Sequence, residues 1–312
     1  MALYLVTGGG GFIGSNLVKA LVERGERVRV LDNFATGKRA NLAEFGNGIE
    51  VLDGDIRDQA ACTRAVESVD YVLHQAALGS VPRSVQDPMT SHEVNATGTL
   101  NLLLAARTAK VRRFVFASSS SVYGNTPTLP KEESMPSSPI SPYAVSKLAA
   151  ERYTLSFNFI YGMETVALRY FNVFGPKQDP DSQYAAVIPR FIMALANNKA
   201  PVIYGDGEQS RDFTFVENVV QANLLACVAP EAPGNVMNIA CGERYSLNLL
   251  AKCLYEIMDK HVPAVYEPER SGDVKHSMAA IERAGHLLSF SPRVKFQEGL
   301  QRTVAWYLTE KV

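Results

Sequence analysis

A tyrosine, a lysine and a serine in this sequence have the types and spacing that proton transfer requires. Tyr143 and Lys147 lie four residues apart in the segment YAVSK, which puts both side chains on one face of a helix. A free phenol has a pKa of about 10, and an adjacent ammonium favours the phenolate, so Tyr143 becomes a usable acid or base. Ser119 can hold the substrate hydroxyl whose proton moves. The three residues are the predicted catalytic group; the alternative is an ordinary solvated helix, on which this Tyr and Lys spacing is common.

A glycine-rich segment, TGGGGFIG at residues 7–14, stands between an apolar run and a helical pattern. Glycines here allow a tight turn and let a pyrophosphate approach the backbone N–H groups of a helix N-terminus. Asp32 ends the next apolar run, where a ribose-binding acid is expected. Its carboxylate accepts from a 2′-hydroxyl and repels a 2′-phosphate, which favours NAD over NADP. The alternatives are a turn cap formed with Asn33 and, because Lys38 and Arg39 lie nearby, NADP.

These residues need a sheet to position them, and the hydrophobic pattern predicts one. Short β-branched runs alternate with helical stretches through the first half of the chain, which predicts a parallel sheet with helices on both faces. The expected strands are residues 3–6, 28–31, 49–52, 71–74, 114–117 and 165–168, and the expected helices are 15–24, a stretch from 58, 95–109 and a stretch after 142.

The pattern changes from Phe171 onward, where prolines and glycines divide it into shorter pieces. A helix at 215–228 and a strand at 236–239 indicate that the chain returns to its first domain before it ends. The predicted fold is a doubly wound α/β Rossmann sheet with a smaller C-terminal α/β domain for the substrate. The expected NAD-binding domain is 1–170 with a return segment at about 212–240, and the expected substrate domain is 171–211 with 241–312.

Composition excludes several classes of partner. The 312 residues include 31 Lys and Arg and 32 Asp and Glu, a net charge of −1, which does not point to nucleic acid or a membrane surface. No apolar run reaches the roughly 18 residues of a spanning helix, and a strand begins at Leu3 without a targeting leader, so we expect a cytoplasmic protein.

No cluster has metal-ligand spacing, and His74 is expected to be a hydrogen-bonded core residue. The cysteines are expected to be buried free thiols: Cys62, Cys227, Cys241 and Cys253.

The motifs together resemble the extended short-chain dehydrogenase/reductases over nearly the whole chain. TGGGGFIG, Asp32, the segment SSSSVYG at 118–124 and YAVSK carry this resemblance. LRYFNVFG at 168–175 and RSGD at 270–273 are similar to the nucleotide-sugar 4-epimerases, those of UDP-N-acetylglucosamine (UDP-GlcNAc) above all. The resemblance implies a retained NAD and a UDP-sugar substrate.

The residues beside the serines separate the reactions of this family. Dehydratases typically carry an Asp-Glu pair near Ser120 and Ser121, and UDP-glucuronate decarboxylases usually carry Glu at the second position, whereas both are serines here. The resemblance then implies 4-epimerisation. Tyr143 takes the 4-hydroxyl proton while hydride leaves C4, and the 4-keto sugar turns over and receives hydride on its other face.

The predicted binding residues fall into two sets. Asp55 and Ile56 follow the third strand and are placed to flank an adenine, the alternative being a strand-end turn. The complete cofactor set is Gly8, Gly11, Phe12, Ile13, Gly14, Asp32, Asn33, Asp55, Ile56, Gln75, Ala76, Ala77, Asn95, Tyr143, Lys147 and Tyr170. The substrate set is Gly79, Ser80, Ser119, Ser120, Ser121, Asn172, Gln178, Val187, Tyr204, Arg211, Arg270, Asp273 and Ser277.

The resemblance also implies roles in the substrate set. Asn172 would contact the diphosphate-sugar, and Arg211 and Arg270 would bind phosphates through their planar forks of donors. Asp273 would contact the uridine side, and Tyr204, like Val187, would line the nucleotide pocket. The alternatives are a surface ion pair of Arg211 with its neighbouring aspartate, a pair of Arg270 with Asp273, and a packed aromatic at Tyr204.

Two departures from the simplest UDP-galactose epimerases favour N-acetylated sugars. Those enzymes often carry Lys where Gly79 stands, whereas Gly79-Ser80 and Gln178 look like the epimerases that prefer acetamido sugars. Ser277 falls at a position that is a bulky aromatic in enzymes restricted to unsubstituted hexoses, and a serine leaves room for a 2-acetamido group. The alternative is an ordinary strand residue at Ser277.

The expected substrates are therefore UDP-GlcNAc and UDP-GalNAc, with UDP-Glc and UDP-Gal also accepted. The second reading is a UDP-glucuronate 4-epimerase, although those enzymes usually carry Thr where Asn172 stands. A non-catalytic NAD-binding regulator is the remote alternative. By resemblance we expect a homodimer formed through residues 95–109 and 143–159.

Overall fold

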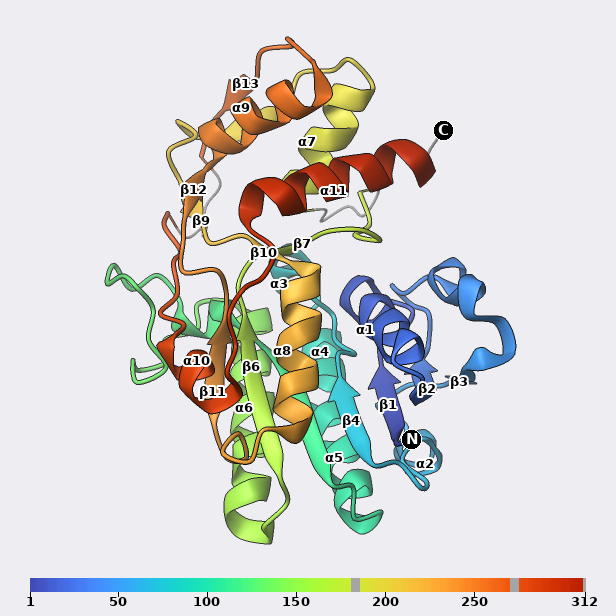
Figure 1. Ribbon diagram of the computed structural model, residues 1–312. Helices are drawn as coiled ribbons and strands as arrows, with labels where there is room; N and C mark the ends of the chain where they lie inside the picture. The colour runs from blue at the N-terminus through green and yellow to red at the C-terminus, as the bar shows by residue number, and fades with distance from the viewer. Residues whose placement is uncertain (181–185, 270–274, 311–312) are drawn as a thin grey trace.

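The computed structural model describes residues 1–180, 186–269 and 275–310 (Figure 1). Its centre is a seven-stranded sheet in the order β11-β6-β5-β4-β1-β2-β3, and every neighbouring pair in it is parallel. The strands are β1 (Leu3–Thr7), β2 (Arg27–Asp32), β3 (Glu50–Asp53), β4 (Tyr71–His74), β5 (Arg113–Ser119), β6 (Thr165–Tyr170) and β11 (Val236–Ile239). The predicted parallel sheet is confirmed.

Helices cover both faces of this sheet. The alternating side chains of β1 explain why: Tyr4 and Val6 face one core cluster, and Leu3 and Leu5 face the other. α1 and α8 pack on the first face, and α2, α5 and α6 on the second. Their bounds are α1 (Phe12–Glu23), α2 (Gln59–Ala65), α5 (Gly98–Thr108), α6 (Pro142–Tyr161) and α8 (Val216–Val228).

The predicted helix over 95–109 differs from the structure at its start. Residues Glu93–Thr97 form a π-helical turn, and the regular helix α5 begins only at Gly98. Asn95 lies buried in this turn, where its side chain bonds to the backbone of Leu78. The wider turn thus places a polar side chain against the segment that follows β4.

A second lobe lies beyond one end of the sheet, where Figure 1 shows α7, α9 and α11. Its core is aromatic. The Phe296 ring stacks on the rings of Phe213 and Tyr245, with ring centres 5.5 Å and 4.1 Å apart, respectively. The lobe contains β7 (Val173–Phe174), α7 (Val187–Ala196), β8 (Val202–Tyr204), β9 (Ser210–Arg211), β10 (Thr214–Phe215), β12 (Tyr245–Ser246), α9 (Leu247–Met258), β13 (Val265–Glu267) and α11 (Phe296–Glu310). The domain limits given above remain predictions.

Shorter elements connect these layers. They are η1 (Arg39–Gly48), α3 (Val81–Gln86), α4 (Pro88–His92), η2 (Glu93–Thr97), η3 (Ser120–Tyr123) and α10 (Glu282–Leu288). Among the described residues, no helix has the length and apolar character to cross a membrane. All four cysteines are free thiols, but Cys253 is only partly buried, which corrects the prediction for that residue.

Candidate active site

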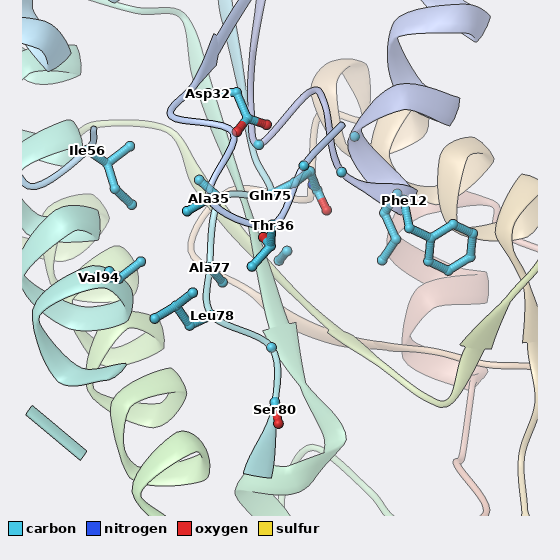
Figure 2. Close-up of a pocket in the computed structure, with 18 of the residues that line it drawn as sticks. Phe12, Asp32, Ala35, Thr36, Ile56, Gln75, Ala77, Leu78, Ser80 and Val94 are labelled. Atoms are coloured by element: carbon cyan, nitrogen blue, oxygen red, sulfur yellow. The ribbon is translucent and has the colours of Figure 1, made fainter. Parts of the chain in front are cut away.

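A cavity of about 1060 Å³ opens where β1, β4 and β5 end (Figure 2). The strand order reverses at β1, which lies between β2 and β4, and ligands of open α/β sheets bind at such a point. In Figure 2, Asp32 lies at one end of the labelled side chains and Ser80 at the other. Most residues that the sequence predicts to bind cofactor or substrate line this cavity. They are Gly8, Gly11, Phe12, Ile13, Gly14, Asp32, Asn33, Asp55, Ile56, Gln75, Ala76, Ala77, Gly79, Ser80, Ser119, Ser120, Ser121, Tyr143, Lys147, Tyr170, Asn172 and Gln178.

Other predicted residues lie elsewhere. Asn95, Val187, Tyr204, Arg211 and Ser277 are not among the residues that line this cavity. Arg270 and Asp273 lie outside the described residues. The structure also adds lining residues that sequence reasoning missed. The most distinctive are Thr36 and Lys177, together with the apolar Leu78 and Val94.

The glycine loop is built for close backbone packing. Gly8 has a φ of +68°, and a Cβ on it would lie 2.8 Å from the Ala76 backbone. A Cβ on Gly14 would lie 2.1 Å from the Gly8 carbonyl oxygen, so a side chain at either position would displace the loop. No side chain caps the amino end of α1. Its first N–H groups are thus available to an anion in the cavity, which fits the pyrophosphate of a dinucleotide.

Asp32 supports this loop as well as facing the cavity. Its carboxylate accepts hydrogen bonds from the backbone N–H groups of Gly10 and Phe34, both at 2.8 Å. Burial raises the pKa of Asp32, and these two bonds oppose the rise. The bond from the Phe34 N–H shows that Asp32 stabilises the turn that contains Asn33, which was the alternative to ribose binding. Asp32 nevertheless also lines the cavity.

Asp55 is already engaged by its neighbours. Arg57 contacts its carboxylate at 2.7 Å, and Asn33 donates to it at 2.8 Å. The hydrogen bond from Arg57 is the main reason that the pKa of Asp55 falls to about 2. The geometry is that of a strand-end turn whose charged carboxylate lines the cavity.

The predicted catalytic residues converge at one side of the cavity. Ser119 ends β5, and Tyr143 lies in the first turn of α6, which Ser141 caps by accepting from the Ala144 N–H at 3.2 Å. The Ser119 hydroxyl accepts from the Ser121 hydroxyl at 2.9 Å. A further hydrogen bond joins Ser119 to the Tyr143 phenol. The end of β5 and the first turn of α6 therefore bring Ser119 and Tyr143, the acid/base candidate, together.

Burial dominates the protonation of this group. It raises the pKa of Tyr143, against the opposing bond from Ser119, and it lowers the pKa of Lys147 to about 7. The nearby Glu151 partly opposes the effect on Lys147. Burial therefore opposes the phenolate at Tyr143 that the adjacent ammonium is predicted to favour.

A buried charge network lies behind Lys147. Glu151 is fully buried and accepts a hydrogen bond from the Ser118 hydroxyl at 2.7 Å. Arg169 donates to both Glu151 oxygens, and its guanidinium lies 4.6 Å from the centre of the Tyr123 ring. The sequence carried a signal for this network, since Glu151 follows Lys147 by one helical turn and Arg169 belongs to LRYFNVFG.

His74 is a core residue, as predicted. Its Nδ1 lies 2.6 Å from the Thr7 hydroxyl and its Nε2 lies 2.9 Å from that of Thr99. Burial lowers the pKa of His74 to about 3, with Lys147 adding to the effect, so the ring is neutral at ordinary pH. Among the described residues, no group of three or more His, Cys, Asp or Glu could hold a metal.

The remaining substrate candidates lie in the segments above the sheet. Asn172, with a φ of +32°, donates to the Asp212 carbonyl at 3.2 Å. Arg211 donates to the Lys275 carbonyl at 3.1 Å, and the Ser277 N–H donates to the Ser210 carbonyl at 3.0 Å. Asp212 is fully buried, so the alternative of a surface ion pair with Arg211 is wrong.

Gln178, Tyr204 and Val187 complete the set. Gln178 donates to the Val173 carbonyl at 3.2 Å. Arg190 lies 5.6 Å from the centre of the Tyr204 ring, and Val187 begins α7. The binding roles of these residues stay predictions.

Comparisons with known proteins show the family of this chain. Residues 4–240 match the model of the NAD dependent epimerase/dehydratase family. A putative UDP-glucose 4-epimerase of Methanocaldococcus jannaschii is 38% identical over 308 residues, covering 97% of this chain and 98% of that protein.

Solved structures agree over the same length. A UDP-N-acetylglucosamine 4-epimerase from Methanobrevibacter ruminantium, in complex with UDP-N-acetylmuramic acid, is 41% identical, with 99% of each chain covered and a TM-score of 0.95. The Thermus thermophilus UDP-glucose 4-epimerase in complex with NAD is 37% identical, with 98% of this chain and 99% of that chain covered and a TM-score of 0.90. The chain therefore belongs to the NAD dependent epimerase/dehydratase family, and its cofactor is NAD.

Proposed function

We propose that this protein is a UDP-hexose 4-epimerase that interconverts UDP-GlcNAc and UDP-GalNAc, and also UDP-Glc and UDP-Gal, with a retained NAD. One observation carries the proposal: Tyr143, Lys147 and Ser119 line the same cavity as the glycine loop and Asp32. The neighbouring Ser120 and Ser121 offer no carboxylate for elimination or decarboxylation. What the site supports is removal and return of hydrogen at one carbon.

The chain's own residues fit the cofactor. The amino end of α1 would hold the pyrophosphate, and Asp32 would accept from a ribose hydroxyl. The nicotinamide, when bound, supplies the acceptor and then the donor of the hydride of substrate C4.

Tyr143 moves the proton in this proposal. As the phenolate, it takes the proton of the sugar 4-hydroxyl, which Ser119 holds in place, and becomes the neutral phenol; it gives the proton back after the sugar has turned. A buried phenolate and a buried ammonium are each costly alone, but on one face of α6 they offset each other's charge. Lys147 thus stabilises the phenolate before it takes the proton and again after the proton has been returned.

The preference for acetamido sugars rests on the space around the sugar site. Nothing lies within 4 Å of a Cβ built on Gly79, so the segment after β4 leaves open space there. Ser277 carries a small side chain on the segment that pairs with Ser210. The likeness to a UDP-N-acetylglucosamine 4-epimerase supports the same substrate class.

We propose a homodimer as the working form. α6 exposes Val145, Phe159 and Ile160 to solvent, with exposed fractions of 51%, 91% and 64%. An apolar helix face of this kind is typical of a contact between subunits.

The proposal is tested by incubating the purified protein separately with UDP-GlcNAc, UDP-Glc and UDP-glucuronate and resolving the products. We expect C4 epimers of the first two and none of the third. Tyr143→Phe should abolish both reactions, whereas Tyr153→Phe, on the exposed side of the same helix, should retain them. An epimer from UDP-glucuronate alone would replace the proposal with the glucuronate reading, and full activity of Tyr143→Phe would remove its mechanism.

A further inference from the structure

Asp212 is a fully buried carboxylate between β9 and β10, outside the catalytic group. Its Oδ1 accepts from the Cys241 N–H at 2.9 Å, and its Oδ2 accepts from the N–H groups of Gly242 at 3.0 Å and Ala279 at 3.2 Å. Each of these donors belongs to the backbone. A charged side chain buried against peptide groups alone is expensive, which indicates that its bonds serve a purpose beyond filling space.

The bonds of Asp212 join three segments that are distant in sequence. Cys241 and Gly242 lie just beyond the end of the edge strand β11, and Ala279 belongs to the stretch that runs beside β9. Both oxygens are used, so one side chain fixes the end of the sheet against two segments of the second lobe.

The Cys241–Gly242 segment carries no residue of the predicted substrate set, but three other segments at Asp212 do. Arg211 precedes it, and Asn172 donates to its carbonyl at 3.2 Å. Ser277 lies two residues before Ala279, whose N–H the carboxylate holds. The carboxylate bond to Ala279 therefore ties the segment of Arg211 to that of Ser277, and Asn172 joins the same segment through the Asp212 backbone carbonyl.

The charge of Asp212 is poised to change near neutral pH. Burial raises its pKa to about 6, the three N–H bonds oppose the rise, and Glu243 adds to it. The other ionisable groups that face it are the Cys241 thiol and the Tyr245 phenol, both of which are neutral at this pH. Protonation would turn one accepting oxygen into a donor that faces N–H groups.

Building on the proposed function, we propose that Asp212 is a positioning residue for the UDP-sugar, whose ionised carboxylate holds its own segment, with Arg211 and the bonded Asn172, against the segment of Ser277 in their binding arrangement. It touches neither the 4-hydroxyl nor the catalytic group. Its loss should weaken substrate binding and leave the proton transfer itself unchanged.

The test compares Asp212→Asn with the wild-type holoenzyme, using UDP-GlcNAc as substrate. A hydrogen bond to a charged group contributes enough that the KM should rise about tenfold or more, with kcat changed less than about threefold. Asp206→Asn, an exposed aspartate in the neighbouring turn, is the matched control and should change neither. An unchanged KM in Asp212→Asn, or a fall in kcat as large as the rise in KM, would overturn the inference.

A second measurement uses the wild-type protein alone and so does not depend on how the variant folds. Lowering the pH from 7.5 to 5.5 protonates Asp212, so the KM of the wild type should rise across this interval; where Asp212→Asn is obtained, its KM should stay level. A wild-type KM that does not change with pH would contradict the inference. Absence of any epimerisation by the wild type would instead remove the proposed function, so the two failures are distinguishable.

Discussion

Arg169 and Glu151 form a bidentate ion pair in the protein interior, next to Lys147. The Nε and Nη2 atoms of Arg169 donate to the two carboxylate oxygens at 2.9 Å and 2.6 Å. Glu151 is fully buried and lies one helical turn after Lys147 on α6. Because Arg169 occupies both oxygens, Glu151 only partly compensates the charge of Lys147, whose pKa is lowered by burial.

This ion pair should contribute strongly to stability as a pair. Glu151→Gln leaves Arg169 buried without its anion, and breaking such a pair lowers the free energy of unfolding by about 3 to 5 kcal/mol. Urea unfolding should show this loss, and the double variant Glu151→Leu/Arg169→Met should recover much of it because no charge is left unpaired. Equal free energies of unfolding for Glu151→Gln and the wild type would show that the ion pair does not stabilise the fold.

The buried Lys147 predicts a rise of stability with pH. Its pKa is about 7 in the folded protein and 10.5 ordinarily, so between these values the unfolded chain binds more protons. The free energy of unfolding should therefore increase as the pH rises from about 7 to about 10. Lys147→Met should flatten that increase in a thermal-unfolding series, and Lys19→Met, an exposed lysine on α1, should not. The same slope in Lys147→Met and the wild type would contradict the assignment.

Asp32 should control retention of NAD. Asp32→Ala removes both the ribose acceptor and the bonds to Gly10 and Phe34, so the NAD content of the purified protein should fall severalfold. Asp53 lies opposite Asp32 in the register of β2 and β3 but is exposed, and Asp53→Ala is the matched control. Cofactor released by denaturation and counted per chain gives the measure. An Asp32→Ala protein as rich in NAD as the wild type would exclude this role.

Ser277 should set the choice between acetamido sugars and free hexoses. Ser277→Tyr adds bulk on the segment beside β9 and should abolish turnover of UDP-GlcNAc while sparing UDP-Glc. Ser277→Ala, which keeps the space, should retain both activities. Rates measured separately on the two substrates decide the matter, and an equal loss on both would remove the gatekeeper role.

The sequence allowed the sheet and much of the cavity to be predicted because their signals are local. The β-branched runs, the glycine loop before α1 and Asp32 at the end of β2 each specify structure within a few residues. The spacing of Tyr143 and Lys147 likewise placed both on one helix face.

The rest depends on contacts between distant segments. No residue near Asp212 in the sequence indicates that its carboxylate accepts hydrogen bonds from the backbone of Cys241 and Ala279. The lowered pKa of Lys147 follows from its burial where α6 packs on the sheet, which the local spacing of residues does not reveal. The π-helical turn around Asn95 is similarly a product of packing.

The central claim is that hydrogen leaves substrate C4 and returns to the same carbon within one site. The most direct measurement is incubation of the protein with UDP-GlcNAc deuterated at C4, followed by mass and NMR analysis of the product. We expect UDP-GalNAc that keeps the deuterium at C4, with no exchange into water. Loss of the label to solvent, or a dehydrated product in place of the epimer, would contradict it.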